Sequence, residues 1–227
     1  MRFCADKPTL NDHWVPTGMT DYLQQSWDAL TEGLPAERQV HLQELLALYR
    51  QPHRHYHNLK HVERLLRLEQ EHHQLLQAPK TVRLAIWYHD AVYNTFKGDN
   101  EVKSADLALR RLAELKVNPA VIDYCCQLIK ATKTHELPDD MANDFDAQFF
   151  MDIDLAVLGA EAAEYDAYTK NIRKEYRFYP GFMYRQGRKK ALKQLLAVRP
   201  LYKTELFFDL YERQARSNMQ RELGQLG

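Results

Sequence analysis

The sequence predicts an all-α protein, and three observations support this prediction. Apolar residues recur every three or four positions almost throughout the 227 residues, as in Leu42, Leu45, Leu46 and Tyr49. The apolar–polar alternation that is typical of β-strands is not sustained in any stretch. Only 8 glycines and 9 prolines interrupt the chain, and it has no repeat or low-complexity tract. Because 45% of the residues are apolar, a chain of this length can form one sizeable core, and we predict a single domain over residues 1–227.

Four helices are predicted from the residues that precede them. Asp, Asn, Ser and Thr side chains accept hydrogen bonds from the first turn of a helix, and proline fits the first helical position because it has no N–H group. Such residues precede 22–30 (Thr20-Asp21), 36–50 (Pro35), 59–70 (Asn58) and 120–132 (Asn118-Pro119).

The other helices are predicted from their periodicity and from the breaks between them. Proline and glycine interrupt helices, and they mark breaks at Gly98, Leu137-Pro138, Pro180-Gly181 and Arg199-Pro200. Helical periodicity covers 80–92, 100–116, 147–158, 161–178, 182–197 and 204–223. We therefore expect a bundle of about nine helices, with a core over about 35–160 and basic C-terminal helices over 161–225 packing on it.

Charge is unevenly distributed, although the formal net charge is zero. Residues 136–166 include ten acids and no Lys or Arg, whereas 170–203 include eleven basic residues and the single acid Glu175. A net charge of zero gives no bulk attraction to nucleic acid or to membranes. We therefore expect a small phosphorylated substrate as partner, in preference to nucleic acid, and a monomer or homodimer.

Cysteine usage and hydropathy indicate the compartment. The three cysteines, Cys4, Cys125 and Cys126, lack the spacing of a metal site or a disulfide framework and are interpreted as reduced, mostly buried thiols. No N-terminal stretch resembles a signal peptide, and no apolar run approaches the roughly 20 residues that span a bilayer. A cytoplasmic location without a membrane partner is expected.

Two segments place histidines where a metal could bind. The segment HRHYHNLKHVERLL has His57 and His61 four residues apart where a helix begins, so both imidazoles can lie on one face. In LAIWYHDAVYN, His89 and Asp90 follow an apolar run that should be buried, where polar groups need a partner or a metal. The alternative for this doublet is a helix end at which His and Asp only form caps and hydrogen bonds.

A third segment, FFMDIDLAVLGA, sets two carboxylates inside an apolar run. A buried carboxylate needs a cation, which can be a basic side chain or a metal. Asp152 can serve as a helix N-cap, which leaves Asp154 as the candidate ligand.

In this order, His, His-Asp and Asp resemble the HD superfamily of metal-dependent phosphohydrolases, which is named for its His-Asp doublet. The YHNLKH element is also similar to the YHNxxH element of cyclic-nucleotide phosphodiesterases, which belong to the same superfamily. The elements RHYHNLKH, AIWYHDAVYN, NEVKSA, DIDLAVLG, IRKEY and QGRKKAL resemble a small bacterial group of predicted HD phosphohydrolases, over most of residues 45–225.

The resemblance implies an HD-type helical bundle in which His61, His89, Asp90 and Asp154 bind the metal, with Asp90 also catalytic. It implies that His57 corresponds to the histidine that protonates the leaving oxygen in the phosphodiesterases. The implied reaction is hydrolysis of a phosphate mono- or diester of a small substrate, such as a nucleotide, by a metal-activated water. Mixed imidazole and carboxylate ligands suit Mn²⁺, Fe²⁺, Co²⁺, Ni²⁺ or Zn²⁺, and we expect one ion rather than two.

Residues outside the metal set are predicted to bind substrate. His135 is expected beside the ligands or in contact with phosphate, with a surface position as the alternative. Glu101 can cap its helix together with Asn100, or can orient the attacking water. Residues 172–196 offer cations for phosphate and rings for stacking a base, unless they form a solvated helix face. The basic candidates there are Arg173, Arg185, Arg188 and Lys189.

Two other functions are left open by the sequence. The HD scaffold also hosts di-iron oxygenases, although this chain has few histidines for a second iron. Alternatively, the domain binds a nucleotide or a protein partner without catalysis and keeps its metal for structure.

Overall fold

The computed structural model describes residues 17–226, and all regular secondary structure in that range is helical. This confirms the predicted all-α fold, and the ten α-helices among these residues correspond to the ten predicted ranges, close to the expected total of about nine. The α-helices are α1 (Thr17–Leu30), α2 (Arg38–Tyr49), α3 (Leu59–His72), α4 (Pro79–Tyr88), α5 (Asn100–Glu114), α6 (Pro119–Ala131), α7 (Phe145–Leu155), α8 (Ala162–Glu175), α9 (Gly181–Ala197) and α10 (Glu205–Gln225). Three short 3₁₀ helices are η1 (His73–Leu75), η2 (Asp139–Met141) and η3 (Ala156–Gly159).

The predicted helix starts are confirmed where an asparagine caps the helix. The Asn58 and Asn118 side chains accept hydrogen bonds from the Lys60 and Ala120 N–H groups, each at 2.9 Å. The starts of the first two helices differ from the prediction: α1 already begins at Thr17, and α2 begins only at Arg38, because Pro35 is followed by a turn.

Asn100 does not cap its helix as expected. It is the first residue of α5, and its side chain makes two hydrogen bonds of 3.1 Å with the backbone of Asn94. Asn100 therefore holds the loop that follows the His89-Asp90 doublet, instead of satisfying the N–H groups of its own helix.

Helix α4 lies at the centre of the core. It packs against α1, α3, α5, α6 and α7, and its residues from Leu84 to Tyr88 are all buried. Because this stretch carries no charged side chain on any side, it must be enclosed by other helices, which explains its position. Trp87 meets Trp27 of α1 edge to face, with ring centroids 5.3 Å apart. The enclosed helix ends at Tyr88, earlier than predicted, and therefore delivers His89 into the interior.

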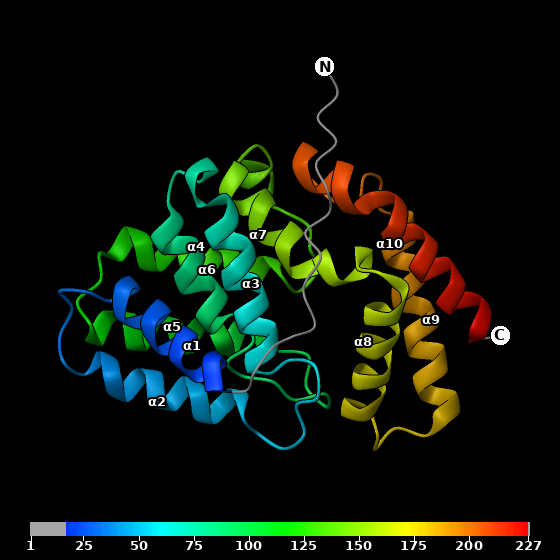
Figure 1. The fold of residues 1–227 in the computed structure, drawn as a ribbon, viewed down its shortest axis with the longest axis horizontal. Helices are drawn as coiled ribbons and strands as arrows, with labels where there is room; N and C mark the ends of the chain where they lie inside the picture. The colour runs from blue at the N-terminus through cyan, green and yellow to red at the C-terminus, as the bar shows by residue number, and fades with distance from the viewer. Residues whose placement is uncertain (1–16, 227) are drawn as a thin grey trace.

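Helices α8, α9 and α10 stand beside the group formed by α1 to α7 (Figure 1). The link between the two groups is η3, which directly follows α7 and packs against α8 and α10. At Gly159 the contact is so close that an added Cβ would lie 2.5 Å from Tyr211 Cβ and 2.9 Å from the Tyr211 carbonyl oxygen. Glycine is therefore required there to let α10 approach.

Asp152 fastens the start of α10 to α7. Its carboxylate, with 0% exposure, accepts hydrogen bonds from the Lys203 N–H (2.7 Å), the Thr204 N–H (2.8 Å) and the Thr204 hydroxyl (2.7 Å). Burial raises the pKa of Asp152 to about 6 although these donors oppose the shift. Asp152 is thus not the N-cap of its own helix, since it lies within α7 and binds the N-terminus of α10 instead.

Cys125 and Cys126 are buried free thiols, as predicted, whereas Cys4 lies outside the described residues. Within residues 17–226, none of the helices combines the length and the apolar character needed to cross a bilayer.

Substituting Gly159→Ala should destabilise the fold by about 1–3 kcal/mol, because the new methyl group forces η3 and α10 apart. Urea unfolding followed by circular dichroism measures this change. Gly224→Ala in α10 is the matched control, since nothing lies within 4 Å of a Cβ at Gly224. It should be as stable as the wild type or more stable by up to about 1 kcal/mol, because alanine favours a helix more than glycine does. Equal stabilities of the two variants would contradict the close approach at Gly159.

Candidate metal centre and its cleft

Three helices bring His61, His89, Asp90 and Asp154 together. His61 lies in the first turn of α3, His89 caps the C-terminus of α4 and is followed by Asp90, and Asp154 lies in the last turn of α7. The two histidines are 4% and 1% exposed, while the carboxylates are half-buried. Among residues 17–226, His61, His89 and Asp90 form the one group of three or more His, Cys, Asp or Glu side chains that can hold a metal ion.

The ligand atoms of this group point at a common space. The Nε2 atoms of His61 and His89 are 3.1 Å apart. Asp90 Oδ2 lies 3.2 Å from His89 Nε2 and 3.8 Å from His61 Nε2. Asp154 Oδ1 lies 3.2 Å from His61 Nε2 and 3.7 Å from His89 Nε2, so Asp154 joins the group through both histidines. Ligand atoms about 2.1 Å from one ion stand about 3.0–3.5 Å apart. The three shorter separations, of 3.1, 3.2 and 3.2 Å, fall in that range, whereas the two longer ones, of 3.7 and 3.8 Å, exceed it.

Hydrogen bonding sets the tautomer of His89 for metal binding. Its Nδ1 lies 2.9 Å from the Ile86 carbonyl oxygen, which can only accept, so Nδ1 carries the proton. In the neutral ring, Nε2 then presents its lone pair to the group. His61 Nδ1 is buried without a hydrogen-bond partner. The group of His61, His89 and Asp90 fits a cation, and its two imidazoles favour a transition metal over Mg²⁺ or Ca²⁺.

In this cluster, the negative carboxylates and the protonated imidazoles stabilise each other's charged forms. Burial opposes ionisation of Asp90, but the His89 and His57 rings lower the pKa of Asp90 well below its usual range. Burial likewise opposes the charge on His89, yet Asp90 and Asp154 raise its pKa to about 9. A bound cation would take the place of that proton, and metal binding should release it.

His135 lies against Asp154. It stands in the loop after α6 with a left-handed backbone (φ 54°), which is uncommon for residues other than glycine. Its Nε2 is 2.9 Å from Asp154 Oδ2, the carboxylate oxygen that is not shared with His61 and His89. The loop therefore places this ring next to a candidate ligand, at the edge of the cleft described below.

His57 is held by Glu175, the last residue of α8. Glu175 Oε2 lies 2.7 Å from His57 Nδ1 and accepts a hydrogen bond of 2.8 Å from the Tyr93 hydroxyl. The other oxygen, Oε1, accepts three backbone N–H groups, those of residues 55, 56 and 57, at 2.7–2.9 Å. Burial opposes the charge on Glu175, which is 3% exposed, but His57 and the backbone donors lower its pKa to about 2.

The carboxylates around His57 favour its protonated form. Burial alone would lower the pKa of His57, but Asp90 and Glu175 raise it above its ordinary value. Because Glu175 engages Nδ1, the Nε2 atom is the one available to a substrate. His57 thus has the fixed ring and the proton that a general acid needs.

Glu175 and Arg54 belong to the site although neither residue was predicted from the sequence motifs. A signal for Glu175 was present, since it is the single acid among the basic residues 170–203. Arg54 is 5% exposed and donates hydrogen bonds to the carbonyl oxygens of Asp90 (2.6 Å), Ala91 (2.8 Å) and His57 (3.2 Å). Arg54 thereby ties the His57 loop to the His89-Asp90 turn, and nothing in its local sequence indicated this.

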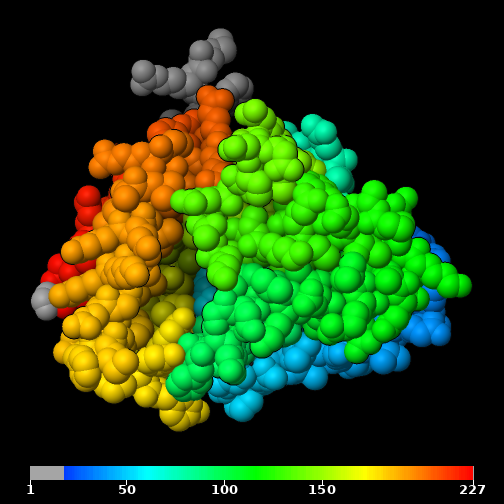
Figure 2. Space-filling model, turned by 180° about the vertical axis from the view of Figure 1, so that it is seen from behind, coloured from blue at the N-terminus to red at the C-terminus, as the bar shows by residue number. Residues whose placement is uncertain are grey.

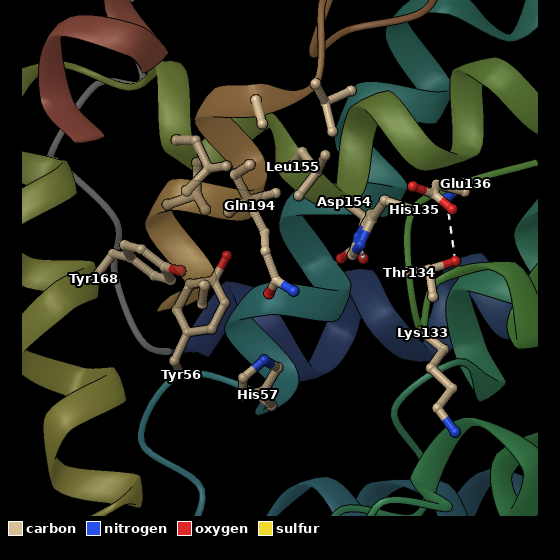
Figure 3. A pocket seen from close by; sticks show the side chains of 16 residues that line it. Tyr56, His57, Lys133, Thr134, His135, Glu136, Asp154, Leu155, Tyr168 and Gln194 are labelled. Atoms are coloured by element: carbon tan, nitrogen blue, oxygen red, sulfur yellow. Dashed lines mark hydrogen bonds and ion pairs between the residues drawn. The ribbon is translucent and has the colours of Figure 1, made fainter. Parts of the chain in front are cut away.

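A cleft of about 960 Å³ opens beside the candidate metal centre. Seen from behind, the molecule is hollowed between the α8 to α10 side, in yellow to red, and the green segments of α5 to α7 (Figure 2). Figure 3 shows Asp154 and His135 on one side of the cleft, Tyr56 and Tyr168 on the other, and the Gln194 amide pointing into it toward His57. A ligand in the cleft can therefore reach both His57 and the candidate metal ligand Asp154.

The predicted substrate-binding residues are more scattered. Arg173 donates to the Tyr176 and Tyr179 carbonyl oxygens at 2.6 and 3.3 Å, which closes the end of α8. Arg188 makes two hydrogen bonds to Glu222, at 2.8 and 2.9 Å. Arg185 is exposed on α9, and Lys189 lines a shallow groove farther along that helix.

Of the residues predicted to bind substrate, only His135 lines the cleft. Glu101 lies in the first turn of α5, and neither Glu101 nor the four basic residues contribute to the cleft wall. Their predicted contacts with phosphate or water stay predictions.

Comparison with known proteins provides no relative of this chain. No protein-family model, no curated protein and no solved structure matches it. Function is therefore inferred from the residues of the site.

Replacing Glu175 by glutamine should show how much the charge interaction between Glu175 and His57 contributes to the free energy of unfolding. Because the folded-state pKa of Glu175 is below its ordinary value, its contribution is present above about pH 4.5 and is lost as the pH falls toward about 2. Glu175→Gln should therefore lower the free energy of unfolding by about 2–3 kcal/mol at pH 7, and by less at pH 3.

Urea titrations at several pH values measure this difference. Glu71→Gln, on the exposed side of α3, is the control and should stay within about 0.5 kcal/mol of wild type. A Glu175→Gln effect that is the same at pH 7 and pH 3 would refute the assigned charge interaction.

Proposed function

We propose that this protein is a metal-dependent phosphohydrolase of the HD type, which cleaves a phosphate ester of a small substrate. One observation supports this most directly: the buried His61, His89 and Asp90 group, extended by Asp154, lies beside a cleft that also contains a fixed, protonatable His57. A metal site that serves structure alone needs neither an open cleft nor a second histidine oriented by a carboxylate.

Each residue has a role that follows from its contacts. A divalent ion held by His61, His89, Asp90 and Asp154 would supply a water of lowered pKa and polarise a phosphoryl oxygen. The Asp90 carboxylate, ionised at neutral pH, can also accept a hydrogen bond from the attacking water. His57 donates its Nε2 proton to the leaving oxygen, while Glu175 stabilises the charged ring. His135 is placed to contact the phosphoryl group next to Asp154.

A single ion is proposed rather than two. Asp154 Oδ2 and His135 Nε2 are in contact with each other, and they join no further group of three or more ligand residues among residues 17–226. This arrangement supports hydrolysis over di-iron oxygenase chemistry, which would need a second, fully ligated iron.

Metal content and hydrolysis should disappear together when a ligand is removed. Purified protein should contain about one equivalent of Mn, Fe, Co, Ni or Zn per chain. His89→Ala should lose the metal and reduce hydrolysis of phosphate esters by about 100-fold or more. Metal analysis, combined with a substrate panel in which each metal is supplied separately, measures both quantities.

The matched control for His89→Ala is His73→Ala, which changes an exposed histidine in η1. It should retain both metal and activity. Undiminished hydrolysis by metal-free protein would exclude the proposed mechanism, and metal binding without turnover of any ester would favour a binding domain.

Removing the proposed proton donor should affect substrates according to their leaving groups. His57→Asn should keep the metal but lower kcat by about 10²–10⁴-fold for alkyl phosphates, whose leaving oxygen needs a proton. The loss should be much smaller for p-nitrophenyl phosphate, because p-nitrophenolate leaves without protonation. Equal losses on both substrates would argue against His57 as the general acid.

A further inference from the structure

The cleft beside the candidate metal centre has a polar part and an apolar part. The charged residues and histidines that line it are His57, Lys133, His135, Glu136 and Asp154. Most of the other lining residues carry aliphatic side chains, which come from the end of α7, from η3 and from the C-terminal end of α9. We call these seven residues the apolar wall: Leu155, Val157, Leu158, Ala191, Leu195, Ala197 and Val198. Because Leu155 directly follows Asp154 in α7, the apolar wall begins next to the candidate metal ligand.

Two tyrosines of the cleft add aromatic surface to the apolar part. Figure 3 shows the loop after α6 and Asp154 on one side of the cleft, and Tyr56 and Tyr168 on the other. The Tyr168 hydroxyl accepts a hydrogen bond of 3.2 Å from Arg188, and the Tyr56 hydroxyl oxygen is enclosed by the protein. The two rings pack edge to face, with centroids 4.7 Å apart. This side of the cleft therefore offers a ligand few hydrogen-bonding groups besides the Gln194 amide.

Contact with an aliphatic chain would remove the accessible parts of the apolar wall from water. Val157 and Leu158 are 4% and 2% exposed, whereas Leu155, Leu195 and Val198 are only half-buried by the protein itself. Burial of apolar surface is favourable roughly in proportion to its area, so each methylene group that leaves water contributes to binding. A nucleobase in the same place would lose water from several donors and acceptors and find few partners. The apolar wall therefore suits an aliphatic chain better than a base.

We propose that the apolar wall binds the alcohol part of the substrate, so that the substrate class of this site is a phosphate ester of an aliphatic alcohol. The phosphate lies at the candidate metal centre, and the chain runs from it along η3 and α9. The position of the phosphate rests on the proposed function, whereas binding of an aliphatic chain by the apolar wall does not.

The test measures how alkylphosphonates of increasing chain length bind to the full-length protein, with its metal as purified, by isothermal titration calorimetry. In these probes the alkyl carbon is bonded directly to phosphorus, so there is no ester to hydrolyse. The dissociation constant should fall about two- to fourfold for each methylene group added between ethyl- and octylphosphonate, because the chain leaves water along the apolar wall. An affinity that does not change with chain length would overturn the proposal.

Two variants alter the apolar wall, and a third is their control. Leu195→Gln introduces a polar side chain of similar length and helix propensity, and should weaken octylphosphonate binding about tenfold while ethylphosphonate binding stays unchanged. Val198→Thr adds a hydroxyl group at nearly unchanged volume and should weaken octylphosphonate binding about threefold. Leu196→Gln is the matched control, since Leu196 is also half-buried and packs against the core but does not line the cleft.

The Leu196→Gln control should bind both phosphonates as the wild type does. Octylphosphonate binding that is unaffected by both Leu195→Gln and Val198→Thr would overturn the proposal. An equal loss of octylphosphonate binding in Leu195→Gln and Leu196→Gln would overturn it as well, because the loss would then not depend on contact with the cleft.

The two proposals can fail separately. Alkylphosphonate binding that strengthens with chain length, without hydrolysis of any ester, would retain the apolar wall as a binding site and refute the phosphohydrolase. Hydrolysis of ethyl phosphate and octyl phosphate with equal kcat/KM would support the phosphohydrolase and refute the role of the apolar wall. A higher kcat/KM for AMP than for octyl phosphate would overturn the substrate class.

Discussion

The buried carboxylate of Glu175 connects the two sides of the cleft. It belongs to α8, yet all of its hydrogen-bond donors come from the loop before α3 and from Tyr93 in the loop after α4. Five hydrogen bonds to one buried carboxylate are costly to break, because each donor would otherwise be left without a partner. The distance between α8 and the candidate metal centre therefore depends on this contact, and so does the orientation of His57.

Asp152 and Asp154 show how a single helix serves both the fold and the candidate site. They are two residues apart in α7, and side chains at that spacing point to different faces of a helix. Asp152 satisfies the N-terminus of α10, while Asp154 approaches His61 and His89. The candidate ligand Asp154 is thus positioned by the same helix that anchors the C-terminal group.

Charged side chains are unevenly distributed between the cleft and the pocket that adjoins it at His57. The cluster of imidazoles and carboxylates can hold a cation and thereby attract phosphate, and His57 carries a proton next to it. Beyond His57 the walls become aromatic, and Arg188 is neutralised by Glu222. The candidate metal centre is therefore a charged end of these adjoining spaces, whereas the walls beyond His57 are mostly aromatic and uncharged.

The sequence by itself determined the helices, several of their caps, and the order of His61, His89-Asp90 and Asp154 along the chain. These features depend on neighbours within one or two turns, as the Asn58 and Asn118 caps illustrate. Only the tertiary structure decided which polar groups meet. His57 and Glu175 are 118 residues apart, and Arg188 pairs with Glu222 from another helix. The physical reason is that a buried charge takes whichever partner the packing of distant helices brings within hydrogen-bonding distance, and local sequence carries no record of that packing.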